Sequence, residues 1–352
     1  KKIKRLWKNL IKEKEFRDSF KYKNIKIFEY IKDDLDFFFS KYLLDVLIDF
    51  ETIKSMIKIE KPDIFCMFGE ASSHGRIINH ITKKEGIPFI GIAHGGTAAY
   101  TPFYVHKKNE INAKEIEPNY CPIPDKTFVY GKHFKDFLIK DCNYEARSVI
   151  VTGATQADIL YRIKKIYNKK EICKELCLDP NKKTVVLTTQ PHLDIEERKK
   201  IAHIACKAVK KLPNIQLIVK MHPMELDFQS YKNIAKLVKI KNSIITRDFD
   251  IYKILYICDV VMTAMSNTLL EAMVLDKPSI IIDPLKKGYS NIYNNSKAIL
   301  VAHDEFRLHK HLKDVLYKRK VIKKLKKLRK TFNHRQFYKI DGKTNKRIAQ
   351  LI

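Results

Sequence analysis

Two polar clusters in the second half of the sequence carry candidate ligand-binding residues. Each follows an apolar run directly, and their polar members are Lys220, His222, Ser266, Asn267 and Thr268. Cationic side chains, hydroxyl groups and the free N–H groups of a helix N-terminus are donors that bind phosphate. Ser, Asn and Thr are also preferred at helix N-termini, so the second cluster predicts the start of a helix. For the first cluster, the alternative is a simple turn that ends a strand.

Three further polar residues belong to the same predicted surface. Thr189 and Gln190 follow the apolar run 184–188, and Glu271 lies one turn into the helix that begins near Ser266. A carboxylate at that place can reach a ribose hydroxyl while a phosphate group rests at the helix end. These residues predict that the second half binds the nucleotide part of a ligand.

In the first half of the sequence, the candidates lie in two loops. One loop contains His94, Gly95 and Gly96, and an earlier loop contains Glu70 and His74. His94 is the candidate general base for an acceptor hydroxyl, because an imidazole can take up a proton at neutral pH. Glu70 is the alternative base, and His74 can support either one. A structural histidine in a tight glycine turn is the competing interpretation of His94.

Alternating strand and helix patterns position these loops. From residue 61 onward, short apolar runs alternate with longer periodic segments, which is typical of parallel βαβ units. We expect an α/β protein with two Rossmann-like domains that face each other across a cleft, where ligands bind at the carboxyl ends of the strands. The expected parts are a helical N-terminal segment at 1–60, a first Rossmann-like domain at 61–168, a second Rossmann-like domain at 169–335 and a C-terminal helix at 336–352 that returns to the first domain.

The chain is strongly basic, with 69 Lys and Arg residues against 40 Asp and Glu residues and a formal net charge of +29. This excess predicts an anionic partner, such as a phosphorylated substrate, a membrane surface or nucleic acid, although a Lys-rich and Ile-rich proteome would also produce it. Nucleic acid is the least favoured partner, because no RNA-binding or DNA-binding motif accompanies the charge. Seven cysteines without a disulfide framework indicate reduced thiols.

Two basic amphipathic segments, from Lys1 to Lys12 and from Lys318 to Lys330, are candidates for contact with an anionic membrane surface. The second has nine basic residues among thirteen. Packing of the apolar sides on the body of the protein is the alternative for both segments. No apolar segment approaches transmembrane length and no signal peptide precedes the first domain, so we expect a cytoplasmic protein that lies peripherally on the inner face of the membrane.

Several short motifs occur in the order and spacing of a known enzyme group. They are Lys61-Pro62-Asp63, Gly86-Ile87-Pro88, His94-Gly95, Lys220-x-His222-Pro223, Asp259-Val260-Val261, Ser266-x-x-x-x-Glu271-Ala272, Lys277-Pro278 and Asp341-Gly342-Lys343-Thr344. From residue 61 onward, the sequence resembles GT-B fold glycosyltransferases of the surface-polysaccharide group. This group contains capsule glycosyltransferases, CDP-glycerol glycerophosphotransferases and UDP-N-acetylglucosamine 2-epimerase-like proteins.

The resemblance implies a nucleotide-activated sugar, linked to CMP, CDP or UDP, as the donor substrate, with no other cofactor and no metal. It assigns His222 and Lys220 to the phosphate of the leaving group, where negative charge develops as the sugar departs. It assigns Glu271 to the ribose. It also makes the domain at 169–335 the nucleotide-donor domain and the domain at 61–168 the acceptor domain. Ala93 and Asn267 depart from the pattern of the group, and these departures leave the identity of the donor open.

Three functions follow from these observations. The first is transfer of a sugar, or of a glycerol-phosphate-type group, to a lipid-linked or polysaccharide acceptor in the synthesis of a cell-surface glycan. The alternative is a UDP-N-acetylglucosamine 2-epimerase-like isomerase, for which Glu70 is the one convincing acid/base carboxylate. The third is a basic nucleic-acid-binding protein. No metal is expected, because Asp248 and Asp250 precede a predicted helix and are expected to cap it.

Overall fold

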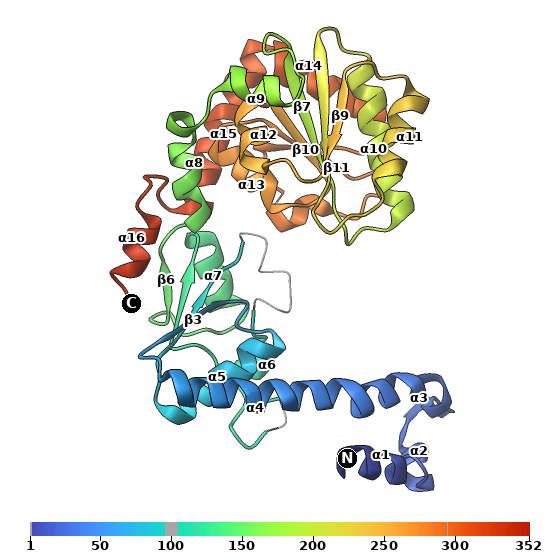
Figure 1. Cartoon of the computed structure of the whole chain (residues 1–352), viewed down its shortest axis with the longest axis vertical. Helices are drawn as coiled ribbons and strands as arrows, with labels where there is room; N and C mark the ends of the chain where they lie inside the picture. Colours follow the sequence, from blue (N-terminus) through green and yellow to red (C-terminus); the bar gives the residue numbers. More distant parts are fainter. Residues whose placement is uncertain (1, 96–104, 118, 294) are drawn as a thin grey trace. The chain divides into compact units, whose positions relative to one another are not determined.

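The computed structural model describes residues 2–95, 105–117, 119–293 and 295–352 (Figure 1). The chain divides into two compact units. Unit 1 consists of Lys1–Ile92 and Pro102–Thr127, and unit 2 consists of Ala93–Thr101 and Phe128–Ile352. The domain boundaries expected from the sequence, at residues 60, 168 and 335, stay predictions.

Unit 1 begins with helices that carry a short hairpin. Its first elements are α1 (Lys2–Leu10), α2 (Lys14–Ser19), β1 (Lys21–Tyr22), β2 (Ile25–Lys26), α3 (Phe28–Phe37), the π-helix η1 (Phe38–Tyr42) and α4 (Leu43–Glu60). The hairpin interrupts a segment that the sequence predicts to be almost wholly helical. Lys23 and Asn24 have φ values of 48° and 67°, and positive φ at both central residues is the geometry of a two-residue hairpin turn.

The first helix packs on the helices that follow it. Trp7 is only 2% exposed, and its Nε1 donates a hydrogen bond of 2.8 Å to Asp36 Oδ1. Its ring stacks on Phe39 with 4.5 Å between the ring centroids. Trp7 therefore packs on the protein, whereas Leu6 is 55% exposed and Ile3, Leu10 and Ile11 are half-buried.

A parallel sheet forms from the first predicted βαβ units. Its elements are β3 (Phe65–Phe68), α5 (Ser73–Glu85), β4 (Phe89–Ile92), α6 (Lys108–Ile111), β5 (Lys126–Val129), α7 (Lys132–Lys140) and β6 (Val149–Val151). The strand order is β3-β4-β5-β6. β3 and β4 pair in parallel, from Phe65 opposite Phe89 to Phe68 opposite Ile92. The α/β class expected from the alternating pattern is confirmed.

Unit 2 contains a second sheet of six strands. They are β7 (Lys183–Thr188), β8 (Ile215–Lys220), β9 (Ser243–Thr246), β10 (Val260–Thr263), β11 (Ser279–Ile282) and β12 (Ile299–Ala302). All neighbours pair in parallel, in the order β12-β11-β10-β7-β8-β9. Every residue of β8, β10 and β11 is buried, as expected for parallel strands that are covered on both faces.

Two groups of helices cover this sheet. They are α8 (Thr155–Ile166), α9 (Lys169–Glu175), α10 (Ile195–Lys210), α11 (Phe228–Val238), α12 (Ile251–Ile257), α13 (Asn267–Val274) and α14 (Glu305–Tyr317). α10 packs against α11 and α14, whereas α12 packs against α8 and α9 (Figure 1). Helices of both groups contact the strands, which gives the layered arrangement of a Rossmann-like domain.

Helix α15 (Arg319–Phe337) carries the second basic segment, and part of its apolar side is buried. Leu325 and Phe332 lie in the core, together with Arg329, whose side chain is only 2% exposed. Arg329 Nη2 and Nε donate to Asp276 Oδ1 at 2.8 and 3.0 Å, and Nη2 donates to the Asp276 carbonyl at 3.1 Å. Val321, Ile322 and Leu328 of α15 are half-buried, and its lysines are exposed. Within the described ranges, no helix is long and apolar enough to span a bilayer.

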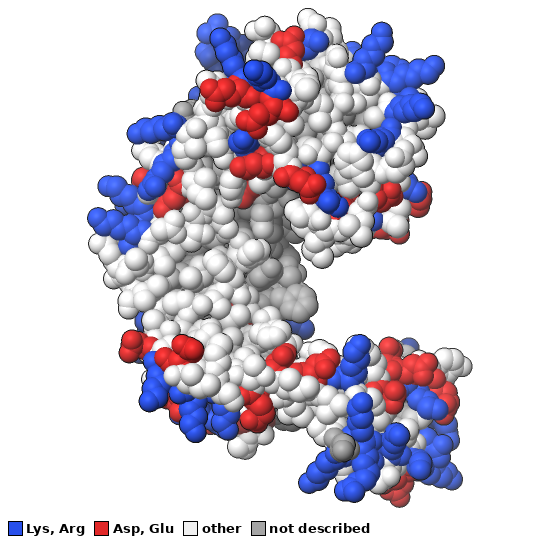
Figure 2. Space-filling model, in the orientation of Figure 1, with Lys and Arg blue, Asp and Glu red and all other residues white. Residues whose placement is uncertain are grey.

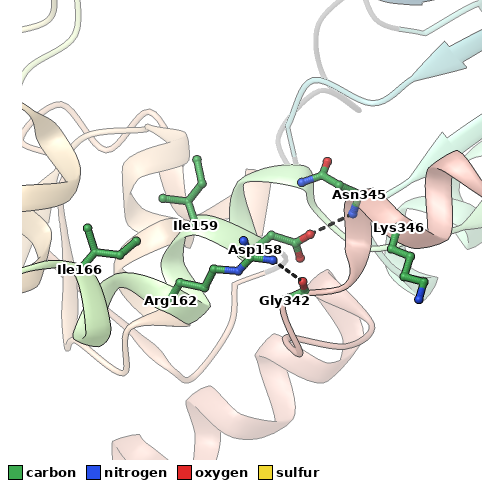
Figure 3. Close-up of a pocket in the computed structure, with 7 residues that line it drawn as sticks. All are labelled: Asp158, Ile159, Arg162, Ile166, Gly342, Asn345 and Lys346. Atoms are coloured by element: carbon green, nitrogen blue, oxygen red, sulfur yellow. Dashed lines mark hydrogen bonds between the residues drawn. The ribbon is translucent and has the colours of Figure 1, made fainter.

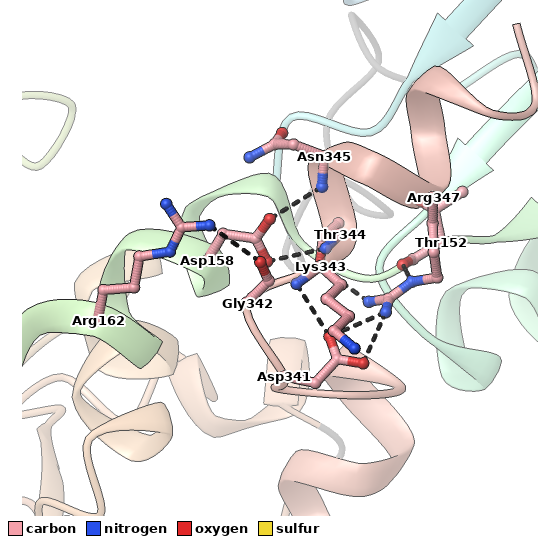
Figure 4. Close-up of polar contacts among 9 residues, drawn as sticks. All are labelled: Thr152, Asp158, Arg162, Asp341, Gly342, Lys343, Thr344, Asn345 and Arg347. Carbon is pink, nitrogen blue, oxygen red and sulfur yellow. Dashed lines mark hydrogen bonds and ion pairs between the residues drawn. The ribbon is translucent and has the colours of Figure 1, made fainter.

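The C-terminal helix α16 (Thr344–Ala349) is held by a network of polar contacts (Figure 4). The Asp158 carboxylate accepts hydrogen bonds of 2.9 Å from the N–H groups of Thr344 and Asn345. Arg347 Nε donates to the Thr152 carbonyl at 2.9 Å, and Arg347 Nη1 pairs with Asp341 at 2.9 Å. The helix therefore contacts residues that precede the second sheet, and all of these residues belong to unit 2. Its predicted return to the first domain stays a prediction.

A pocket of about 330 Å³ lies beside this contact (Figure 3). Its lining residues are Asp158, Ile159, Arg162, Ile166, Gly342, Asn345 and Lys346. The Asp158 carboxylate is already used to hold the start of α16, and Arg162 donates to the Gly342 carbonyl at 3.3 Å. None of the site residues predicted from the sequence lines this pocket, so it takes no part in the site described next.

Candidate active site

The turn after β10 carries the predicted phosphate-binding cluster. Ser266 caps α13, because its Oγ accepts hydrogen bonds from the Thr268 N–H at 3.2 Å and from Thr268 Oγ1 at 2.9 Å. The helix begins at Asn267, directly beyond a fully buried strand. Its first N–H groups therefore lie at the carboxyl end of a central strand, where Rossmann-like sheets bind ligands. The predicted helix start at Ser266 is confirmed.

A buried tyrosine that the sequence analysis missed holds this turn in place. Tyr293 lies at the end of the 3₁₀ helix η3 (Tyr289–Tyr293) and is 1% exposed. Its hydroxyl accepts a hydrogen bond from the Ser266 N–H and donates one to the Ser266 carbonyl, both at 2.8 Å. One side chain thus fixes both backbone groups of the cap residue. No local pattern marks it, because it lies 27 residues after the turn.

Side chains at the end of β7 connect this strand to its neighbours. Thr188 Oγ1 lies 3.1 Å from Thr268 Oγ1, and Gln190 Nε2 donates to Thr263 Oγ1 at 3.3 Å. Gln190 is buried, so its amide serves to join β7 to β10. Its predicted contact with a nucleotide stays a prediction.

Thr189 joins β7 to the turn that follows β8. Its Oγ1 accepts a hydrogen bond of 3.0 Å from the His222 N–H and donates one to Glu225 Oε1. The buried Glu225 carboxylate also accepts from Arg198 Nη1 at 3.1 Å and from the Tyr231 hydroxyl at 2.6 Å. Arg198 compensates the buried negative charge, which would otherwise be costly. The sequence analysis missed the roles of Glu225, Arg198 and Tyr231, because they come from three separate elements.

The imidazole of His222 is oriented with Nε2 as its donor. The Met224 N–H donates to His222 Nδ1 at 3.2 Å, so the proton of the neutral ring lies on Nε2. Burial lowers the pKa of His222, which favours the neutral ring. Burial, followed by the charge of the nearby His222, lowers the pKa of His192. His192 is exposed and provides a second imidazole at this end of the sheet.

The ammonium group of Lys220 is bound mainly within the protein. Its Nζ donates to the Met221 carbonyl at 3.0 Å and to the Arg247 carbonyl, and burial lowers its pKa. Two of its three N–H groups are thus used, and its predicted contact with phosphate stays a prediction.

Asp250 caps α12 through the Tyr252 N–H at 2.7 Å, which confirms the expected cap. Within the described part of the chain, no three His, Cys, Asp or Glu side chains are grouped to hold a metal ion.

The structure brings His94 and Gly95 to the start of α13. A Cβ atom added to Gly95 would lie 2.5 Å from Asn267 Nδ2, so the glycine backbone contacts the Asn267 side chain. The Tyr130 hydroxyl lies 2.8 Å from the His94 carbonyl oxygen and 2.7 Å from Gln156 Oε1. The buried Tyr130, which the sequence analysis missed, therefore holds the backbone of the exposed His94. Gly96 lies outside the described residues.

Glu271 lies on α13 near the hydroxyl of a second tyrosine. The Tyr252 hydroxyl donates a hydrogen bond of 3.4 Å to Glu271 Oε1. Burial raises the pKa of Glu271 from 4.5 to about 7, and the hydrogen bond opposes this shift. The carboxyl group can therefore exist in either protonation state near neutral pH. Its predicted contact with ribose stays a prediction.

The other two predicted residues, Glu70 and His74, belong to unit 1 and have separate partners there. The Glu70 side chain is 2% exposed and accepts a hydrogen bond of 3.4 Å from Thr127 Oγ1. A Cβ atom on Gly91 would lie 2.3 Å from Glu70 Oε2, so the carboxyl group packs directly on the β4 backbone. His74 Nε2 lies 3.2 Å from Asp49 Oδ2 on the surface. The proposed roles of both residues as base and supporting group stay predictions.

A Glu70→Gln variant should have a flatter dependence of stability on pH. Burial raises the pKa of Glu70 from 4.5 to about 7. Between these values the folded chain keeps a proton that the unfolded chain releases, so the free energy of unfolding falls as pH rises and levels off above about 7. Glutamine stays neutral and retains the size of the side chain. Urea unfolding of both proteins across this pH range checks the prediction, and parallel curves would contradict it.

The fold and the position of these loops define the general class of the protein. Two parallel sheets of Rossmann-like topology, with candidate ligand-binding loops at the carboxyl ends of strands, are the features of the GT-B class. The chain belongs to the UDP-N-acetylglucosamine 2-epimerase family, whose model matches residues 122–352. No curated protein matches the chain.

Solved structures of this class have the same fold at low sequence identity. The UDP-GlcNAc 2-epimerase of Neisseria meningitidis, bound to UDP-GlcNAc, has a TM-score of 0.63 at 16% identity over 87% of this chain and 80% of its own. MnaA of S. aureus, in complex with UDP, has a TM-score of 0.59 at 16% identity over 86% and 79%. The wall teichoic acid polymerase TagF has a TM-score of 0.54 at 16% identity over 77% and 69%. The resemblance to the surface-polysaccharide group is thereby confirmed.

Proposed function

We propose that this protein transfers a group from a nucleotide-activated donor, such as a UDP-linked or CDP-linked sugar, to a lipid-linked or polysaccharide acceptor. The observation that carries the proposal is the contact of Gly95 with Asn267. It brings the loop that carries the exposed His94 to the start of α13, where the candidate phosphate-binding residues lie. A nucleophile-activating group next to a leaving-group site is what a transfer reaction requires.

The leaving phosphate group is bound by the second sheet in this proposal. The Ser266 hydroxyl, which accepts from Thr268, offers its own proton as a neutral donor, and His222 adds Nε2–H from the neighbouring turn. These donors stabilise the negative charge that builds up on the phosphate oxygen as its bond to the sugar breaks. Tyr293 keeps Ser266 in place, so the donors need little rearrangement.

His94 acts as the general base in the same step. Its imidazole takes the proton from the acceptor hydroxyl, the acceptor oxygen forms a bond to the anomeric carbon, and the bond from that carbon to the nucleotide phosphate breaks. Tyr130 supports this role because it holds the His94 carbonyl and thereby limits the movement of the loop. The proton remains on the imidazole until it is released to solvent.

A UDP-N-acetylglucosamine 2-epimerase is the second candidate, and the family match favours it. Epimerisation removes a proton from carbon 2 of the sugar and returns one to the opposite face, so it needs groups that can exchange protons there. The Glu70 carboxyl group is a poor candidate, because it is buried against the β4 backbone. This argument supports transfer over epimerisation.

Two successive measurements on the purified protein distinguish the two candidate functions. A thermal-shift screen with CMP, CDP, UDP and their sugar conjugates identifies the nucleotide, and His222→Ala should weaken its binding about 10-fold or more, since a hydrogen bond to a charged group is lost. The bound donor is then incubated in D₂O. Acceptor-dependent release of nucleotide without deuterium in the sugar supports transfer, whereas deuterium at carbon 2 without an acceptor identifies an epimerase. No stabilisation by any nucleotide would refute both.

A further inference from the structure

The N-terminal part of unit 1 forms a small, strongly basic module. We define the basic tip as residues 2–28, which comprise α1, α2 and the hairpin β1–β2. It contains ten Lys and Arg residues against three Asp and Glu residues, a formal charge of +7, whereas residues 29–60 contain four Lys against eight Asp and Glu. Figure 2 shows Lys and Arg side chains gathered over α1 and α2, at the lower right. The positive charge is therefore concentrated at the tip.

The basic tip has an aromatic core of its own. Phe16 packs edge-on against Trp7, Phe20 and Phe28, with centroid distances of 6.0, 5.1 and 6.2 Å. Trp7 also stacks on Phe39 of η1. These rings fill the core of the basic tip. Large apolar side chains that remain exposed therefore belong to its surface.

The hairpin presents two such side chains among lysines. Tyr22 and Ile25 form a cross-strand pair and are 62% and 61% exposed. Lys21 and Lys26 form the adjacent pair, and Lys23 Nζ lies 5.5 Å from the centroid of the Tyr22 ring. Aromatic and branched apolar side chains surrounded by lysines are typical of surfaces that bind at the interface of an anionic bilayer.

We propose that the basic tip docks on an anionic lipid bilayer. Tyr22 and Ile25 enter the headgroup region, while the surrounding lysines contact lipid phosphates. A second copy of the tip is a poor partner because the two like charges repel each other. The inference goes beyond the proposed reaction, since docking requires neither donor nor acceptor, and it revises the predicted membrane surface. Trp7 of α1 is packed inside the protein and Leu6 is 55% exposed, so the hairpin supplies most of the exposed apolar contact.

Co-sedimentation with vesicles of phosphatidylcholine, with or without phosphatidylglycerol, tests the proposal on the full chain. Binding should require the anionic lipid and weaken with salt. Replacing Lys21, Lys23 and Lys26 together by Glu should reduce binding about 10-fold or more. The double variant Tyr22→Ser/Ile25→Ser should also reduce binding about 10-fold or more. Equal binding to neutral vesicles, or unchanged binding by the charge-reversed variant, would overturn the proposal.

Matched controls separate this surface from the general basicity of the chain. Lys232, Lys236 and Lys241 are exposed lysines in unit 2, and their joint replacement by Glu removes the same charge. Leu237→Ser removes a side chain that is 72% exposed. Both controls should bind vesicles like the unaltered protein, and so should His94→Gln. If the unit 2 charge variant loses as much binding as the hairpin variant, the tip has no specific role.

The single tryptophan of the chain reports whether the tip docks as a folded module. Trp7 is buried, so brominated acyl chains should leave its emission unchanged on binding. A Tyr22→Trp variant adds a second tryptophan at the hairpin, and this added emission should be quenched. Quenching of Trp7 itself would mean that α1 leaves Phe39 to insert, which overturns docking by the folded tip. The protein could instead self-associate in light scattering without binding vesicles. If the double variant Tyr22→Ser/Ile25→Ser abolished that self-association, a second copy of the chain would be the partner.

Discussion

A His94→Gln variant should lose group transfer by about 10²- to 10⁴-fold, the range that a positioned general base contributes. Glutamine can keep a polar contact but cannot take up the proton of the acceptor hydroxyl. Binding of the nucleotide should be preserved, because its donors come from the turns that carry Ser266 and His222. Single-turnover transfer and nucleotide affinity, measured on the same preparation, check this result.

A Tyr130→Phe variant serves as the matched control. It removes the hydroxyl that holds the His94 carbonyl and leaves the imidazole intact. We expect a smaller loss of rate than in His94→Gln, with the same dependence of rate on pH as the unaltered protein, because the base is still present. If His94→Gln retains full transfer, the histidine is structural. If it loses nucleotide binding in parallel with transfer, it belongs to the donor site.

An Asp276→Gly variant should destabilise unit 2 by about 3 kcal/mol, because it leaves the buried guanidinium of Arg329 without its charge partner. The carboxylate accepts hydrogen bonds from Arg329 Nη2 and Nε at 2.8 and 3.0 Å. Glycine is the appropriate replacement, since Asp276 has a φ of 59° and glycine adopts that conformation without strain. The midpoint of urea unfolding measures the loss.

The second substitution of this test restores stability. Adding Arg329→Met removes the buried charge and fills much of the same volume with an apolar chain, so the double variant should regain most of the lost stability. Lys326, which lies 3.3 Å from Asp276 on the surface, provides a contrast. Lys326→Met should change stability by less than about 1 kcal/mol, as is usual for exposed ion pairs. A double variant as unstable as Asp276→Gly would show that the loss arises elsewhere.

The parallel strands are the part of the fold that the sequence predicts best. The apolar runs 215–220 and 279–282 predict strands with the bounds that β8 and β11 have. Such strands are buried on both faces, so their composition alone identifies them. The hairpin at Lys21–Tyr22 and Ile25–Lys26 escapes this reasoning because all four of its residues are exposed. β12 (Ile299–Ala302) also escapes, since it is only partly buried.

A site residue can be predicted from the sequence only where its contacts are with residues nearby in the chain. Ser266 follows β10 directly, and its side chain makes a cap that a local pattern indicates. Tyr293, Tyr130 and Glu225 act on backbone or side chains that lie far away in the sequence. Their hydroxyl and carboxylate groups have no periodic or spacing signal, because long-range packing alone decides what they contact. Such supporting residues therefore require coordinates.

The attachment of α16 also bears on the order in which the ribosome delivers the parts of the fold. Asp158 receives the N–H groups of Thr344 and Asn345, which follow it by 186 and 187 residues. During synthesis, all six strands of the second sheet leave the ribosome before the N–H groups that bind the Asp158 carboxylate. Contacts of such long sequence separation form late in folding. The nascent chain therefore carries an exposed α8 surface for much of translation, and chaperones have the opportunity to bind it before α16 covers it.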